Sequence, residues 1–78
     1  MPIAGVVILA EPEKTDEVLT RLNDTPNITT YGVHKENHII AVFEAESSKG
    51  LEEISQQISR DIPGIQGIFP AYVSFEDE

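Results

Sequence analysis

The chain has 78 residues, of which 40% are hydrophobic and 24% charged, so it encodes one small globular domain (residues 1–78) and not a disordered segment. It contains no cysteine, which excludes disulfides, thiolate catalysis and sulfur-ligated metals and fits a reducing compartment. Fourteen acidic residues against five basic ones give a net charge of −9, which disfavours nucleic acid and anionic lipid surfaces as partners. The charge either favours a basic partner or only keeps a small protein soluble.

The N-terminal residues lack the basic region and apolar stretch of a secretory signal. The longest apolar runs are far too short to span a bilayer as a helix. We therefore expect a cytoplasmic protein without a membrane span.

The first half of the chain has the pattern strand, helix, strand. Ile3 to Ala10 is a continuous apolar run, typical of a buried strand. Glu13 to Asn23 has apolar residues at helical spacing and follows Pro12, a residue favoured at helix starts. Ile28 to His34 is rich in β-branched residues but more polar, which predicts an edge strand.

The second half repeats this pattern after a short polar turn at residues 35–37. His38 to Ala45 predicts a second apolar strand, and Ser47 or Ser48 can cap a helix that ends at Asp61 to Gly64. Ile65 to Phe75 predicts the last strand. It contains Pro70, which cannot donate a ladder hydrogen bond and so belongs at a sheet edge or a bulge.

Two βαβ units in tandem, with the weak second and the proline-bearing fourth strand outermost, predict the sheet order 4-1-3-2. The expected fold is an α+β, ferredoxin-like βαββαβ sandwich with a four-stranded antiparallel sheet. Because two helices can cover only one face of such a sheet, the other face is the expected functional surface.

The alternation of side chains along the third strand predicts which residues lie on the uncovered face. Glu44 is the only charged residue of that strand, so the set Ile40, Val42 and Glu44 should face away from the helices. In the first strand we expect Val7 and Leu9 beside them. In the fourth strand the candidate set is Gly67, Phe69, Ala71 and Val73.

These residues would form a large exposed apolar patch. Soluble monomers rarely expose such a patch, so it indicates a partner, a ligand or self-association. Coverage by a loop, by the tail or by a second copy in a homodimer is the alternative.

No group of residues in the sequence predicts catalysis, so we expect a protein that is not an enzyme and binds no cofactor. Ser47 and Ser48 have no base at a fixed offset and fit helix caps. His34 and His38 bracket the predicted turn and could approach each other, but no third ligand has a recognisable spacing, so no metal site is predicted. Helix dipoles and solvation explain the carboxylates near the helix starts, which are Glu11, Glu13, Asp16, Glu17, Glu52 and Glu53.

Three segments resemble the NapD family, which comprises cytoplasmic chaperones for the catalytic subunit of periplasmic nitrate reductase. They are IAGVVILAEPEK (Ile3 to Lys14), VFEAESS (Val42 to Ser48) and IPGIQGIFPAYV (Ile62 to Val73), and the likeness spans essentially the whole chain. The resemblance implies that the chain binds the twin-arginine signal peptide of the reductase. It would delay export by the Tat translocase until the molybdenum cofactor is inserted.

By the same resemblance the signal peptide would lie on the open sheet face, with Glu44 or a neighbouring carboxylate near the arginines. The expected contact residues are Val7, Leu9, Ile40, Val42, Glu44, Phe69 and Val73. The pair Phe69-Pro70 would make the fourth-strand edge stiffer and more hydrophobic than the family pattern requires.

Two other classes share the βαββαβ topology. One is a stand-alone small-molecule-binding regulatory module of the ACT or Lrp type, although Pro63-Gly64 and Gly67 fit its glycine-rich loops only loosely. The other is a purely structural dimer module. A nitrate reductase gene with a twin-arginine leader beside the gene for this chain would discriminate the chaperone from both.

Overall fold

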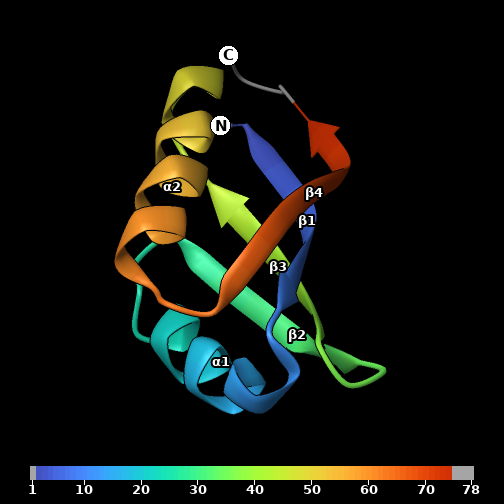
Figure 1. The fold of residues 1–78 in the computed structure, drawn as a ribbon. Helices are drawn as coiled ribbons and strands as arrows, with labels where there is room; N and C mark the ends of the chain where they lie inside the picture. Colours follow the sequence, from blue (N-terminus) through green and yellow to red (C-terminus); the bar gives the residue numbers. More distant parts are fainter. Residues whose placement is uncertain (1, 75–78) are drawn as a thin grey trace.

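In the part of the chain that the structure describes, four strands and two α-helices follow one another in the predicted order, and a 3-10 turn precedes the first α-helix (Figure 1). The structure is a computed structural model that describes residues 2–74, with side chains through residue 71. The elements are β1 (Ile3–Ala10), η1 (Pro12–Lys14), α1 (Thr15–Asn23), β2 (Ile28–His34), β3 (His38–Glu44), α2 (Ser48–Asp61) and β4 (Ile65–Ser74). The part of the last predicted strand at Phe75 lies outside the described residues.

The strands form one antiparallel sheet in the order β2-β3-β1-β4. This is the predicted order 4-1-3-2 counted from the other edge, and both helices pack on the same side of the sheet (Figure 1). The ferredoxin-like α+β prediction is therefore confirmed. Pro70 lies on an edge strand, as its missing N–H requires, and a register irregularity follows directly beside it.

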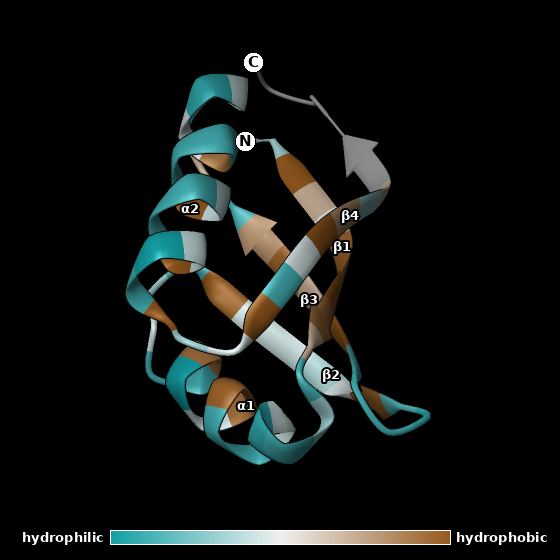
Figure 2. Cartoon of the chain, viewed as in Figure 1, coloured by the Kyte–Doolittle hydropathy of each residue, from teal (hydrophilic) through white to brown (hydrophobic). Residues whose placement is uncertain are grey.

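The core lies between this sheet and the helices. Burial alternates along β1 and β3, because successive side chains of a strand point to opposite faces. The buried set of β3 is the one without Glu44, as predicted, and the helices turn their hydrophobic sides toward it (Figure 2). Two strands, β1 and β3, and both α-helices contribute most of the buried side chains. These include Val6, Ile8, Ile39, Ala41, Phe43, Val18, Leu22, Leu51 and Ile58.

The helix ends differ slightly from the sequence prediction. The first helix was expected from Glu13, but residues 12–14 form a 3-10 turn in which the Lys14 amide donates to the Glu11 carbonyl at 2.9 Å. The α-helix then begins at Thr15. At α2 the cap is Ser47, whose hydroxyl accepts from the Gly50 amide at 3.1 Å. Among residues 2–74, no helix has the length and apolar character needed to cross a membrane.

Candidate functional site

The sheet face opposite the helices has a row of four apolar residues that crosses all four strands. Val7 pairs directly with Ile40 on β3 and with Phe69 on β4. On β2 the register shifts between Thr30 and Val33, so Tyr31 and Gly32 together stand opposite Ile40 in a β-bulge. We call Tyr31, Ile40, Val7 and Phe69 the central row. With neighbouring strands about 4.8 Å apart, the row is about 14 Å long.

The central row is the most exposed apolar part of the described chain. Tyr31 is 66% exposed, Phe69 55% and Ile40 37%. The other large exposed hydrophobic residue, Val33, pairs with the core residue Ile39 and so does not belong to this face. A row of exposed apolar side chains with an aromatic ring on each edge strand is unusual on the surface of a soluble monomer. It therefore indicates a binding partner.

The residues on either side of the central row are apolar (Val42 and Leu9), small (Gly5 and Gly67) or polar (Thr29 and His38). Val42 lies between Gly5 and Thr29 on one side, and Leu9 lies between Gly67 and His38 on the other. Gly67 has a packing role, because a Cβ there would approach the Cε2 and Cζ atoms of Phe69 to 2.9 Å. The Phe69 ring therefore rests over Gly67.

The open face also has a distinctive charge distribution. The four strands contain no lysine or arginine, and Glu44 is their only carboxylate. Asp16 and Glu17 at the start of α1 belong to the helical layer on the other side of the sheet. The five basic residues all lie in helices, in η1 or in the hairpin turn, at Lys14, Arg21, Lys35, Lys49 and Arg60.

Six of the seven residues predicted for the site share this face. By register and burial they are Val7, Leu9, Ile40, Val42, Glu44 and Phe69. The seventh predicted residue, Val73, pairs with Ala4 in the sheet register. The irregularity between Gly5 and Val6 leaves Ala71 without a partner and shifts the alternation by one residue. The side chain of Val73 itself lies outside the described residues.

Tyr31 was not among the predicted site residues. An uninterrupted hairpin would pair it with Ala41 on the core face, and only the bulge moves it opposite Ile40. The sequence carried one signal of this change, namely Gly32, because a glycine inside a strand often marks a bulge. Its φ of +103° is a backbone conformation that residues with a side chain rarely adopt.

The two histidines meet at one end of the open face, where His34 pairs directly with His38. The Nδ1 atom of His38 is buried and has no hydrogen-bond partner in the described part of the chain. Residues 2–74 contain no group of three or more His, Asp or Glu side chains that could hold a metal ion.

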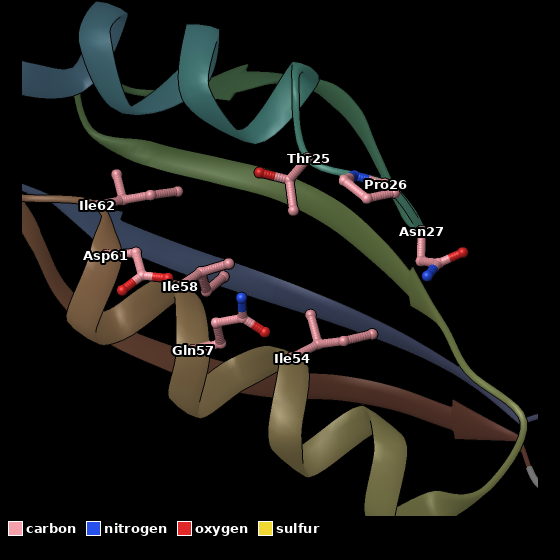
Figure 3. A pocket seen from close by; sticks show the side chains of 8 residues that line it. All are labelled: Thr25, Pro26, Asn27, Ile54, Gln57, Ile58, Asp61 and Ile62. Carbon is pink, nitrogen blue, oxygen red and sulfur yellow. The ribbon is translucent and has the colours of Figure 1, made fainter.

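Two surface hollows lie beside α2, on the helical side of the sheet. One of about 220 Å³ opens between α2 and the segment that joins α1 to β2, and Ile54 and Ile58 project into it from α2 (Figure 3). Another of about 230 Å³ lies between α2 and the β1–β4 side of the sheet. Most of the apolar side chains that line them belong to the core or pack against it: Ile54, Ile58 and Ile62 in the first, and Ala4, Val6, Phe43, Leu51 and Ile68 in the second. We therefore place the candidate site on the open sheet face, where the exposed apolar side chains gather.

Fold and site together define a class of protein: a ferredoxin-like α+β domain that presents an uncovered, apolar sheet face. A family model described as NapD protein matches residues 1–77. The chain therefore belongs to the NapD family, and the predicted resemblance is confirmed.

Two solved structures share the fold. A hypothetical protein, PHS023 from Pyrococcus horikoshii, has a TM-score of 0.83 at 23% identity, over 100% of this chain and 94% of that one. The solution structure of the E. coli Tat proofreading chaperone NapD has a TM-score of 0.76 at 24% identity, over 97% of this chain and 80% of that one. A comparison with curated protein sequences gave no match.

Proposed function

We propose that this chain is a cytoplasmic chaperone that binds the twin-arginine signal peptide of the catalytic subunit of a periplasmic nitrate reductase. It holds the peptide back from the Tat translocase until the cofactor of the reductase is inserted. Membership of the NapD family and a fold shared with a Tat proofreading chaperone support this role. On this proposal the chain performs no chemistry and needs no cofactor of its own.

The observation that carries the proposal is the central row beside a single carboxylate. A twin-arginine signal has a basic motif followed by an apolar, helix-prone stretch. An apolar face without lysine or arginine, and with Glu44 on it, matches both halves of that peptide.

The peptide is expected on the face of the sheet and not at an edge. Adding a strand needs a regular edge with free N–H and C=O groups. Pro70 and the adjacent irregularity interrupt the β4 edge, and the bulge at Tyr31 and Gly32 interrupts the β2 edge. The open face, in contrast, offers only side chains.

A peptide on this face must satisfy its own backbone hydrogen bonds, because the backbone groups of the sheet are already paired. A helix does so, and its diameter of about 10–12 Å fits the roughly 14 Å length of the central row. The expected contacts are Val7, Leu9, Ile40, Val42 and Phe69, with Tyr31 added, and with Glu44 near the arginines.

Isothermal titration calorimetry with a synthetic signal peptide of the nitrate reductase tests the proposal. The native peptide should bind, and a peptide with both arginines replaced by alanine should bind markedly less tightly. Equal binding of the two peptides would contradict the proposed recognition of the twin-arginine motif. Sedimentation of the free protein tests the competing possibility that a second copy covers the face, since a homodimer closed over the central row would have to dissociate before the peptide binds.

A further inference from the structure

The two ends of the open face differ in charge. Ile3 pairs with Glu44 on one side and with Ser74 on the other, so all three lie at the same end of the sheet. We call this the carboxylate end. Glu46 lies two residues beyond the end of β3.

At the opposite end no strand carries a carboxylate, and the nearby Glu13, Asp16 and Glu17 lie in η1 and α1, which belong to the helical layer. Leu9 pairs there with His38 and Gly67, and the hairpin turn contributes Lys35 and Glu36. Near the end of β1, the Glu11 carboxylate is 3.7 Å from the Lys14 ammonium group, so these two charges largely cancel. We call this the histidine end. Between the two ends lies the uncharged central row.

We propose that the open face binds the signal peptide in one orientation, with the twin arginines at the carboxylate end and the apolar stretch extending across the central row toward the histidine end. This inference rests on the proposed function of the same face. It adds a direction that follows from the register of Glu44, Ile3 and Ser74 at one end and of Leu9 and His38 at the other.

The reverse orientation is disfavoured at both ends. It would bring two guanidinium groups toward Leu9, toward the two histidines and toward Lys35, without a carboxylate on a neighbouring strand. It would also place the apolar stretch of the peptide against Glu44 and leave that carboxylate without water or a cation. In the proposed orientation the arginines approach Glu44, and the apolar stretch of the peptide lies against the uncharged central row.

Paramagnetic relaxation measured by NMR tests the orientation directly. The protein has no cysteine, so a nitroxide label can be attached to a single cysteine of a synthetic peptide that has Arg-Arg at one end and a Leu/Ala stretch at the other. A label beside the arginines should broaden the amide signals of Ile3 and Glu44. A label at the end of the apolar stretch should broaden those of Leu9 and His38. The opposite pattern, or equal broadening at both ends by both labels, would overturn the inference while leaving the proposed function intact. Absence of any binding would overturn the two together.

A charge-neutralising pair of variants supplies an independent test. Glu44→Gln removes a carboxylate at the carboxylate end, and Glu36→Gln removes one from the hairpin turn at the histidine end. Both residues are exposed, and both variants change the net charge equally. We expect Glu44→Gln to weaken binding of the Arg-Arg peptide about fivefold, as for a solvent-accessible ion pair, and to leave a Gln-Gln peptide unaffected. A larger effect of Glu36→Gln than of Glu44→Gln would refute the orientation.

Discussion

Phe69 contributes both to folding and, on the proposed function, to peptide binding, and the two contributions can be separated. The residue is 55% exposed, so somewhat less than half of its surface is already buried in the free protein. Complete burial of a phenylalanine stabilises by about 3 kcal/mol at most. Phe69→Ala should therefore lower the free energy of unfolding by about 1.3 kcal/mol, and it should lower the free energy of peptide binding by about 1.6 kcal/mol if the bound peptide covers the exposed part.

The binding loss corresponds to an affinity about fifteenfold lower. A domain of this size has a stability of about 4–12 kcal/mol, so the variant remains folded. Urea denaturation followed by circular dichroism gives the first quantity, and titration calorimetry with the signal peptide gives the second. The two losses together should approach the value for full burial.

Val33→Ala is the matched control. Val33 is also an exposed apolar strand residue, at 38%, but it pairs with Ile39 and not with the central row. Its replacement should lower the stability by about 1 kcal/mol and leave the peptide affinity within about twofold. If Phe69→Ala lost stability but kept its affinity, or if Val33→Ala lost affinity equally, the peptide would not lie on the central row.

Three further substitutions and one control test the same site and the fold. Val42→Glu places a second carboxylate in the middle of the open face, and calorimetry should show binding at least tenfold weaker because a bound peptide would desolvate the charge. Gln57→Glu, which adds the same charge on α2, should not change the affinity. Gly67→Ala puts a Cβ 2.9 Å from the Phe69 ring, so the ring must move, and fluorine NMR of a labelled Phe69 should show a shifted signal; an unchanged signal would contradict the described packing. Ser47→Ala removes the hydroxyl that caps α2 and should cost about 1 kcal/mol in urea denaturation, whereas a loss below about 0.3 kcal/mol would mean that the cap contributes little.

The sequence determined the elements that depend on local patterns. The bounds of β1 and β2 agree with the prediction, because a continuous apolar run and a β-branched run are strong signals for strands. The outward set of β3 followed from Glu44, since a period of two leaves a charged residue only one favourable side. The position of Pro70 at an edge followed from its missing donor.

Only the tertiary structure decided which residues of the edge strands complete the open face. The irregularity beside Pro70 shifts the pairing of β4 by one residue, so that Val73 pairs with Ala4. The bulge at Tyr31 and Gly32 brings an aromatic residue opposite Ile40 that an uninterrupted hairpin would have placed on the core face.

The physical reason is that the alternation of a single strand is local, whereas register depends on pairing between strands. One extra residue in either edge strand moves every later side chain to the other face, and only hydrogen bonding to a neighbouring strand shows where that residue lies. The alternation of apolar side chains thus predicted an apolar face, whereas the net charge left open whether the partner is basic. The pairing of Val7 with Ile40 and Phe69 decided which side chains form the row, and the pairing of Ile3 with Glu44 and Ser74 decided at which end its negative charge lies.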